Sequence, residues 1–500
     1  MNYSAALTTE LAGALQRHLL RDDRQEDLTF AVYFPSHGSA RTTGVIHRAV
    51  WPEDGDRHIH GNVSFESDYF LRALFEAADA GGGVAFLHSH PDGRGWQRMS
   101  DDDVDAENGI ARQALATTGL PLLGLTVAGD GTFCARFWSL EDQEPKRRWC
   151  ESVRVVGERI AISRPPPTTR FAVATSLDRT VSAWGPGVQE ELGELHIGIV
   201  GAGSVGALVG EALVRIGVRR VTLIDFDTVN DVNLDRLLHA YPIDARLGRP
   251  KVTTLRNALM RSAVATKPEV TAIEASVVEE AGYRAALDCD ILFSCVDRPW
   301  GRFALNMAAY AHLIPVIDGG IRVRSCGGQE LLGADWKAHL VGPTRRCLEC
   351  LGQYDPGFVT LEREGHLDDP RYIEGLPEDH PLRSRENVFP FSMSTASFEV
   401  LQMISAIVAP IGVGDVGALT YHFVTGELDR EIRGCKKSCL FSSSLLGTGE
   451  TNSIPVTGPH PAADAARAER DCQPSISRIG LRLLERGQHV FERLIDRLSR

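Results

Sequence analysis

Two histidines one residue apart, followed by a run of acidic residues, are the first side chains whose types and spacing could do chemistry. In FLHSHPDGRGWQRMSDDDVDAE (86–107), His88 and His90 end an apolar run that is typical of a strand. Alternate strand residues share a face, so both imidazoles can bind one metal ion. A catalytic zinc takes three protein ligands and keeps one position for water, so a carboxylate is needed as well. The acidic run supplies candidates, and a separate glutamate would then serve as a proton shuttle.

The segment HSHP followed by Ser-x-x-Asp resembles the JAMM motif of the JAB/MPN metalloproteases, which cleave isopeptide or peptide bonds after ubiquitin-like proteins. The resemblance spans roughly residues 1–160 and implies an α/β metalloprotease domain. Its Ser-x-x-Asp pattern implies Asp103 as the third zinc ligand and Ser100 as an oxyanion stabiliser, whereas the usual family spacing selects Asp101. The family glutamate falls on Glu26, just ahead of the predicted strand LTFAVYF, with Glu53 and Glu66 as alternatives.

A glycine-rich loop about a hundred residues later predicts a phosphate site of different chemistry. The stretch LHIGIVGAGSVGALVGEALVRIGVRRVTLIDFD (195–227) has the pattern of a strand, a glycine turn, a helix and a second strand. Gly201, Gly203 and Gly206 open the helix, where backbone N–H groups can bind phosphate. Asp225 ends the second strand and could hold a ribose hydroxyl. These features alone fit a nicotinamide oxidoreductase equally well.

Three further segments, DFDTVNDVNLDR (225–236), GRPK (248–251) and CDILFSCVDRPWGRFALN (289–306), resemble the ThiF-type activating enzymes. These enzymes adenylate the C-terminal glycine of ubiquitin-like proteins, and the resemblance covers about residues 174–440. It implies a Rossmann-like domain that uses ATP and Mg²⁺. Carried over by position, the nucleotide-binding residues are Asp225, Asp227, Asn233, Arg236 and Lys251, with Asp297 as the magnesium ligand and Arg302 and Asn306 supporting its loop. The cations would spread the charge of the transition state.

The same resemblance implies a homodimer, in which Arg179 reaches the phosphates bound by the neighbouring subunit. The family usually has a glutamine directly after the arginine of its NLxR motif, and this chain has Leu237 there. One polar contact to the nucleotide is therefore in question.

The cysteines form two close pairs that suggest metal binding rather than oxidation. In the family, two such pairs bind a structural zinc, which implies the ligands Cys347, Cys350, Cys435 and Cys439. Cys289 and Cys295 flank an apolar strand and are expected in the core.

No cysteine lies between Cys350 and Cys435, where many family members carry a catalytic one. The acyl group could pass directly to the thiol of a conjugating enzyme. Alternatively, a hydroxyl could form an oxygen ester, with Ser384 as the first candidate and Ser392 and Ser394 next.

Length and composition predict several domains in an acidic globular protein. Five hundred residues exceed one core, and a net charge of −13 argues against nucleic acid or an anionic membrane as main partner. The N-terminal MNYSAALTTELAGALQRHLL predicts an amphipathic helix rather than a signal peptide, which favours a cytoplasmic protein. The predicted divisions are a metalloprotease domain (1–162), a proline-rich linker (163–173), an adenylation domain (174–446), a flexible linker (447–473) and a C-terminal helix (474–500).

The two halves together predict a bifunctional α/β enzyme acting on one substrate class. An adenylyltransferase would activate the C-terminal glycine of a ubiquitin-like protein, and a zinc peptidase would trim its precursor or remove it from conjugates. The expected partners are that protein, a conjugating enzyme and a second copy of the chain; the expected cofactors are ATP, Mg²⁺ and two Zn²⁺ ions. The resemblance implies a bacterial conjugation operon that serves phage defence. The alternatives are an activator and processor of a sulfur carrier, a catalytically inactive scaffold dimer, and the oxidoreductase, which the downstream motifs disfavour.

Overall fold

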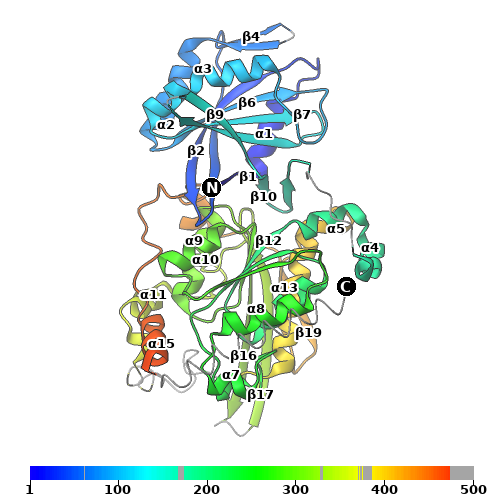
Figure 1. Cartoon of the computed structure of the whole chain (residues 1–500), viewed down its shortest axis with the longest axis vertical. Coiled ribbons are helices and arrows are strands. Elements are labelled where there is room, and N and C mark those ends of the chain that lie inside the picture. Colours follow the sequence, from blue (N-terminus) through cyan, green and yellow to red (C-terminus); the bar gives the residue numbers. More distant parts are fainter. Residues whose placement is uncertain are drawn as a thin grey trace.

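The computed structural model contains two α/β domains stacked along the long axis of the molecule (Figure 1). It describes residues 1–60, 62–142, 144–166, 174–326, 330–369, 371, 374 and 386–472. The N-terminal domain ends at Ser163, and the C-terminal domain begins at residue 174. Ser384, the predicted helix 474–500 and most of the predicted linker 163–173 lie outside the described residues.

A nine-stranded mixed sheet forms the centre of the N-terminal domain, in the order β11-β10-β1-β3-β2-β6-β7-β8-β9. Its strands are β1 (Asn2–Thr8), β2 (Leu28–His37), β3 (Arg41–Val50), β6 (Gly83–His90), β7 (Leu122–Ala128), β8 (Phe133–Glu141), β9 (Glu144–Trp149), β10 (Ser152–Val156) and β11 (Ile160–Ser163). A separate hairpin joins β4 (Arg57–His60) and β5 (Asn62–Phe65). Helix α1 (Thr9–Leu19) covers one face of the sheet, and α2 (Ser67–Asp79) and α3 (Asp101–Thr118) cover the other. Along β2, Ala31 and Tyr33 pack with α1, whereas Phe30 and Val32 pack with α2 and α3.

Seven of the first eight residues of the predicted N-terminal helix form a strand instead. Residues Asn2–Thr8 form β1, which pairs in parallel with both β3 and β10. Helix α1 begins only at Thr9, where the Thr8 hydroxyl accepts a hydrogen bond from the backbone N–H of Leu11. Leu7 would fit the apolar side of an amphipathic helix, but it is buried in the sheet. Pairing with distant strands therefore overrides the local helical pattern.

An eight-stranded sheet forms the C-terminal domain, in the order β14-β13-β12-β15-β16-β17-β18-β19. Its strands are β12 (His196–Val200), β13 (Arg220–Ile224), β14 (Glu269–Ile273), β15 (Ile291–Ser294), β16 (Val316–Cys326), β17 (Glu330–Val341), β18 (Ala418–His422) and β19 (Glu427–Glu431). The first five strands in that order are parallel, and the last three are antiparallel. The parallel strands are apolar on both sides because helices cover both faces. This confirms the predicted α/β class and the strand, turn, helix and strand order around the glycine loop.

Helices α9 (Glu280–Leu287) and α10 (Pro299–Tyr310) pack on one face of this sheet. The other face carries α6 (Ser204–Arg215), α8 (Lys251–Ser262) and α13 (Phe389–Val408). The remaining helices are α4 (Asp178–Trp184), α5 (Pro186–Gly193), α7 (Pro242–Arg246), α11 (Pro356–Arg363), α14 (Leu440–Ser443) and α15 (Pro461–Cys472). Single 3₁₀ turns cover Thr175–Leu177, Asp231–Asn233, His366–Asp368 and Pro410–Gly412.

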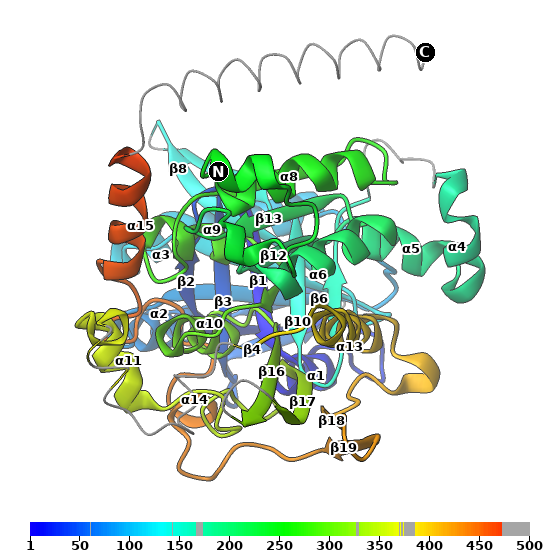
Figure 2. The ribbon, with the colours of Figure 1, turned by 90° about the horizontal axis from the view of Figure 1, so that it is seen from below.

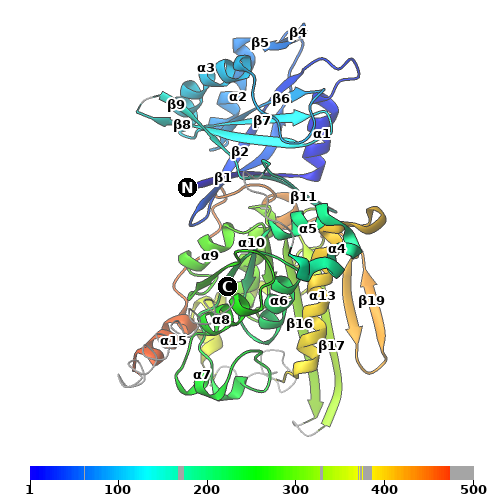
Figure 3. The same cartoon turned by 45° about the vertical axis from the view of Figure 1, so that its right-hand side comes forward.

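Helix α13 is the one described helix that is long and apolar enough to cross a membrane by length and composition. It lies along the long β16–β17 hairpin (Figure 3), and its buried side includes Val400, Met403 and Ala406. Its apolar character is therefore used in the core of the C-terminal domain.

The predicted flexible linker 447–473 is, up to Cys472, a packed segment that ends in a helix. The Glu450 carboxylate accepts a hydrogen bond from the His37 backbone N–H at 3.0 Å and pairs with Arg284. The Trp300 indole donates to the Val456 carbonyl, and Arg467 of α15 pairs with Glu279 at 2.6 Å. Helix α15 lies at the edge of the molecule (Figure 2). The Gly, Pro, Ser and Thr composition predicted flexibility, but these contacts with both domains order the segment.

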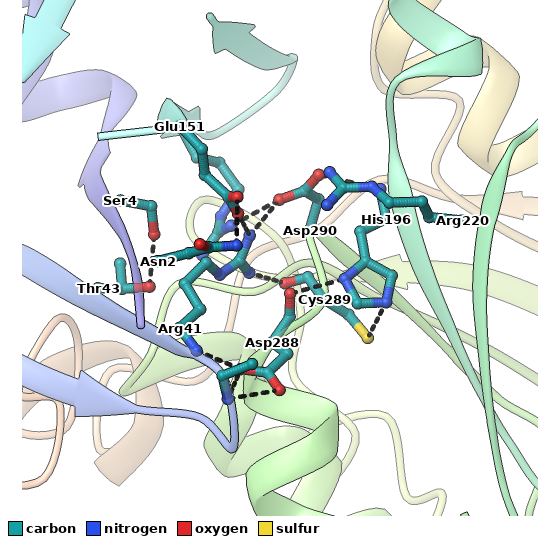
Figure 4. Close-up of polar contacts among 12 residues, drawn as sticks. Asn2, Ser4, Arg41, Thr43, Glu151, His196, Arg220, Asp288, Cys289 and Asp290 are labelled. Carbon is teal, nitrogen blue, oxygen red and sulfur yellow. Dashed lines mark hydrogen bonds and ion pairs between the residues drawn. The ribbon is translucent and has the colours of Figure 1, made fainter. Parts of the chain in front are cut away.

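A buried polar junction joins the two domains (Figure 4). Arg41 of β3 pairs with Asp290 at 2.7 Å, and Arg164 approaches the other oxygen of the same carboxylate at 2.8 Å. Asp288 accepts hydrogen bonds from the backbone N–H groups of Ala40 and Arg41. Burial opposes ionisation of Asp290, but the arginines outweigh it and hold the pKa of this carboxyl well below its usual range. Because Asp290 directly precedes β15, the N-terminal domain is tied to the start of a central strand.

Candidate active sites

The structure brings His88, His90 and Asp103 together at the end of β6. The two histidines close this strand, which lies between β2 and β7, and Asp103 stands in the first turn of α3. His88 Nε2 lies 3.3 Å from Asp103 Oδ1, and His90 Nε2 lies 3.2 Å from Asp103 Oδ2. His88 is 3% exposed, so the cluster is open to solvent mainly on the side of His90.

Ser100 fixes the position of Asp103 through a reciprocal capping box. The Ser100 hydroxyl accepts a hydrogen bond from the Asp103 backbone N–H at 3.1 Å, and the Asp103 carboxylate accepts one from the Ser100 N–H at 2.8 Å. Burial disfavours the charged carboxylate, but hydrogen bonds from His88 and His90 outweigh it and hold the pKa of Asp103 below its usual range. The aspartate is therefore an anion held between the two rings.

These three side chains fit a zinc ion. Ligands at 2.0–2.2 Å from a tetrahedral zinc lie about 3.3 Å apart. The two observed nitrogen–oxygen distances, 3.3 and 3.2 Å, match that spacing. The three donor atoms all lie within 4.8 Å of one another, and two imidazoles with one carboxylate leave a fourth position open.

Glu26 lies beside this cluster, directly ahead of β2. Burial raises the pKa of its carboxyl, while the nearby His90 and His88 oppose the rise. The competing residues lie elsewhere: Asp101 is exposed at the start of α3, Glu53 approaches Arg72 at 3.7 Å, and Glu66 pairs with His58 at 2.7 Å. Of the candidate acids, Glu26 and Asp103 are thus the two that face the histidines.

A buried charged group beneath the cluster was missed in the sequence. The Glu107 carboxylate accepts hydrogen bonds from Arg136 and from the Trp138 indole, and Arg136 also donates to Thr126. The Thr126 hydroxyl lies 3.3 Å from His88 Nε2. An arginine within the apolar strand TFCARFW was the available signal, because a buried arginine needs an anionic partner.

The second site begins at the glycine loop between β12 and α6. Gly201 has a φ of +98°, and a Cβ there would lie 2.4 Å from the Cys295 carbonyl oxygen. A Cβ on Gly206 would lie 1.9 Å from the Gly201 carbonyl oxygen, whereas one on Gly203 would meet nothing within 4 Å. The first and third glycines are therefore required for packing, and the loop presents the N-terminus of α6 to an anion.

Asp225 and Lys251 lie beside this loop. The Asp225 carboxylate accepts hydrogen bonds from the backbone N–H groups of Ala202 and Asp227, both at 2.7 Å. Burial raises the pKa of Asp225 to about 6, although the Lys251 ammonium opposes the rise. Lys251 pairs with Asp227 at 2.7 Å. The Asp225 and Asp227 carboxylates outweigh the effect of burial and raise the pKa of Lys251. Lys251 therefore remains a cation inside the site.

One open pocket of about 1810 Å³ is lined by most of the predicted nucleotide-binding residues. Among its walls are Gly201, Gly203, Asp225, Asp227, Asn233, Arg236, Lys251, Asp297 and Arg302. A typical small-ligand site has roughly 300–1,000 Å³, so this pocket has room for more than a nucleotide. Asp297 follows the end of β15 and is exposed toward the pocket.

Two details differ from the expected nucleotide site. Asn306 is fully buried, accepts a hydrogen bond from the Leu348 N–H and donates to the Tyr354 hydroxyl. It therefore holds the segment after β17 and not the Asp297 loop. Leu237 is 8% exposed and packs in the core, so no polar side chain replaces the family glutamine.

Comparison with known proteins agrees with this geometry. Residues 176–417 match the ThiF family. Among curated proteins, the molybdopterin-synthase adenylyltransferase of Escherichia coli (strain K12) is 34% identical over 134 residues, which cover 26% of this chain and 51% of that protein. The ubiquitin-like modifier-activating enzyme 5 of Caenorhabditis elegans is 30% identical over 148 residues, covering 28% of this chain and 35% of that protein. This chain thus spans about half the length of the first of these relatives, and less of the second.

We refer to the part of the chain that matches this family, residues 176–417 with the rest of its sheet, as the ThiF domain. Among solved structures, E. coli MccB with ATP is similar over 54% of this chain and 74% of that one, at 18% identity and a TM-score of 0.40.

Arg179 lies on the surface of the ThiF domain, in α4, and it does not line the pocket. Within one chain it therefore does not reach the predicted phosphate position. Its contact with a neighbouring subunit stays a prediction.

Four cysteines gather next to the ThiF domain pocket: Cys347, Cys350, Cys435 and Cys439. Their sulfurs all lie within 4.8 Å, and those of Cys347 and Cys439 are 3.6 Å apart. Tetrahedral zinc–sulfur bonds of about 2.3 Å place neighbouring sulfurs about 3.8 Å apart, so the group fits a zinc ion. Cys289 is buried and Cys295 half-buried, both against core strands, as predicted for residues of the core.

The candidate serines differ in their surroundings. Ser392 is fully buried in the first turn of α13 and donates a hydrogen bond to the Asn387 amide oxygen, whereas Ser394 is half-buried in the same helix. Ser384 lies outside the described residues. Two pocket residues that the sequence reading missed, Arg322 and Lys337, lie on β16 and β17. The alternation of Arg322 and Arg324 with apolar residues in IRVRS was the signal for Arg322.

Proposed function

We propose that the ThiF domain adenylates the C-terminal glycine of a ubiquitin-like or sulfur-carrier protein, and that the His88–His90–Asp103 centre is a zinc peptidase for the same class of protein. The observation that carries the first activity is one pocket holding the glycine loop, Asp225, Lys251 and Asp297. The relatives, which are named as adenylyltransferases or modifier-activating enzymes, support the same activity.

Adenylation joins two anions, so the site must lower their repulsion. A terminal carboxylate oxygen of the carrier would bond to the α-phosphorus of ATP, while the bond to the pyrophosphate oxygen breaks. Asp225 accepts a ribose hydroxyl proton in a hydrogen bond, and Arg236 and Lys251 face the phosphates. Asp297 is the residue that would hold Mg²⁺, which neutralises charge on the phosphate oxygens.

The peptidase proposal rests on the fit of the three ligands and on the position of Glu26. When bound, zinc acts as a Lewis acid and lowers the pKa of a coordinated water. Glu26, whose pKa is raised by burial, would accept a proton from the attacking water and donate it to the leaving amine. Ser100 would donate a hydrogen bond to the carbonyl oxygen as negative charge develops on it.

Transfer after adenylation has two routes in this proposal. The thiol of a conjugating enzyme could attack the adenylate directly, because no cysteine lies between Cys350 and Cys435. In the second route, a sulfur-carrier role, a sulfur donor would attack the glycine carbonyl of the adenylate, AMP would leave, and a thiocarboxylate would result once the donor releases the sulfur. The 34% identity to a molybdopterin-synthase adenylyltransferase favours keeping this second function. In either role, we propose a homodimer with Arg179 at the neighbouring pocket.

The test is ATP–pyrophosphate exchange, with and without a small glycine-ending protein encoded beside this gene. The full chain carries His88→Ala so that the carrier stays intact. We expect exchange that requires the carrier, vanishes with Asp297→Ala, and persists with Asp231→Ala on an exposed turn outside the pocket. Mass spectrometry of the carrier after incubation with a sulfur donor separates the thiocarboxylate role.

Two results would contradict the adenylation proposal. If a correctly trimmed carrier supports no exchange, or if Asp231→Ala and Asp297→Ala are equally inactive, the adenylation proposal fails for that carrier.

A further inference from the structure

The antiparallel part of the ThiF domain sheet has two unlike faces. On β16 and β17, Ile321, Val323 and Trp336 point toward α13, and the Trp336 ring stacks on Phe391 at 5.2 Å. Alternation along each strand turns Gly320, Arg322 and Lys337 to the other face, which forms a wall of the pocket. Because Gly320 pairs with Lys337, and Arg322 with Asp335, the Arg322 and Lys337 side chains lie diagonally across the two strands.

Three cations meet on this face, which we call the cationic wall: Arg302, Arg322 and Lys337. Arg302 reaches it from α10. A Cβ built on Gly320 would lie 3.4 Å from Arg302 Nη2 and 3.5 Å from Lys337 Cε, so the two side chains approach each other over the glycine. Burial, with Arg302 and Arg322 nearby, lowers the pKa of Lys337 to about 8.

The two carboxylates beside the wall, Asp318 and Asp335, already have cationic partners. Arg302 lies 3.4 Å from Asp318, while Asp335 is taken by Arg324 at 3.3 Å and His422 at 2.8 Å. Within the described part of the chain, neither the exposed Arg322 side chain nor the half-buried Lys337 side chain has an ion pair or a hydrogen bond. Like charges held together in a pocket repel unless an anion binds between them.

The position of the wall argues against nucleotide phosphate as that anion. Strand β17 is four strands from β13, and strands are about 4.8 Å apart, so the wall lies about 19 Å from the ribose-binding end of β13. The glycine loop, Arg236 and Lys251 already serve the phosphates on that side. The wall lies beyond Asp297, where the acyl substrate must enter.

We propose that the cationic wall binds an acidic side chain in the C-terminal tail of the carrier protein. This inference rests on the proposed function, and it adds a sequence preference for the substrate. Strand β17 is two strands, about 10 Å, from β15, whose end leads to Asp297. An extended tail covers about 3.4 Å per residue, so the aspartate or glutamate lies about three residues before the terminal glycine.

The test compares three fluorescent ten-residue peptides that end in Gly-Gly and differ only in the third residue before the terminal glycine: glutamate, glutamine or lysine. Binding to the full chain is measured by anisotropy. We expect the glutamate peptide to bind about tenfold more tightly than the glutamine peptide, since it gains a charge-assisted hydrogen bond. Lys337→Met should remove most of this difference. The double change Lys337→Glu with Arg322→Glu should reverse it in favour of lysine.

Controls separate the wall from other sources of the effect. Arg261→Glu, on the exposed end of α8, changes the net charge without touching the pocket and should leave the preference intact. ATP affinity should not change in Lys337→Met. The glutamate preference should persist in peptides with an amidated C-terminus, where no terminal carboxylate exists.

Each contrary result overturns the proposal. These results are equal affinity for the glutamate and glutamine peptides, no binding of any peptide at millimolar concentration, loss of ATP binding in Lys337→Met, or loss of the preference on amidation. Failure of adenylation is distinguishable, because the peptides would then keep their order of affinity while carrier-dependent exchange is absent.

Discussion

At the scale of single residues, the candidate zinc site at His88 and His90 depends on which aspartate supplies the third ligand. Ser100 and Asp103 cap each other at the start of α3, and that geometry turns the Asp103 carboxylate toward both histidines. Asp101, two residues earlier on the same helix, faces solvent. The two residues have the same chemistry, and only the direction of the side chain separates them.

Asp103→Asn should therefore remove one zinc per chain. The amide keeps the capping hydrogen bond but loses the charge that a zinc ligand needs, so metal analysis should give one zinc instead of two and peptide hydrolysis should disappear. We expect the remaining zinc at the four cysteines, where it should resist mild chelation longer. Asp101→Asn is the matched control and should keep two zinc ions per chain. An equal loss of zinc in both variants would contradict the assignment of Asp103.

We expect Asp225 to make nucleotide binding depend on pH. Its pKa of about 6 is raised above the ordinary value, so the carboxylate that we propose for the ribose hydroxyl is present above pH 6 and is lost as the pH falls. Between pH 7.5 and 5, the ionised fraction falls about tenfold, and we expect ATP affinity to fall by a similar factor. Calorimetry of the protein and of Asp225→Asn isolates this carboxylate from the titration of ATP itself. Parallel pH profiles for the two proteins would show that Asp225 does not contribute.

At the scale of elements, the turn from β12 to α6 depends on two close backbone contacts. Gly201 approaches Cys295 of the next strand, and Gly206 packs its α-carbon on the Gly201 carbonyl. Gly203, between them, has free space around it and lines the pocket. The three glycines therefore have different roles, although they belong to one motif.

Gly206→Ala should lower the unfolding free energy by about 1–3 kcal/mol, because its methyl group would overlap a backbone oxygen. Gly203→Ala should leave thermal stability unchanged and weaken ATP binding, because its methyl group enters only the space left for phosphate. Thermal unfolding and ATP titration of both variants check this pair. Equal destabilisation by the two changes would be inconsistent with the loop as described.

At the scale of the whole molecule, the junction between the domains is a buried ionic cluster around Asp290. Removing one partner of a buried pair typically costs 3–5 kcal/mol because the other charge remains buried. Arg41→Met should therefore lower the unfolding free energy by about that much and separate thermal unfolding into two transitions, one for each domain. Arg24→Met is the control: its pair with Asp92 is exposed, so the loss should be below about 1 kcal/mol. A single unshifted transition in Arg41→Met would contradict this view of the junction.

The same arrangement separates the two sites. Strand β2 begins beside the histidines, where Leu28 pairs with His88, and ends at the junction, where His37 meets Glu450. Its ten residues span about 33 Å. The proposed adenylate site lies beyond the junction, so under our proposal a carrier tail would leave one site before it enters the other. His88→Ala should leave pyrophosphate exchange unchanged, and Asp297→Ala should leave hydrolysis unchanged; a loss of either activity in the other site's variant would indicate coupling.

What the sequence determined by itself was local. An apolar strand ending at the glycine turn, an apolar run ending in His88 and His90, and two close cysteine pairs each specify a structure within a few residues, because strand alternation and turn chemistry act at that range. The partners of these motifs were implied by the resemblance to known families. The α/β class followed from the same local patterns.

Only the tertiary structure decided features that depend on distant contacts. Residues 2–8 became a strand because β3 and β10 lie on both sides of them, and residues 447–472 became ordered because both domains hold them. The choice of Asp103 required the direction of α3 relative to β6. The cationic wall required two strands and a helix to meet, since burial and charge balance belong to an assembled surface, which no single segment of sequence contains.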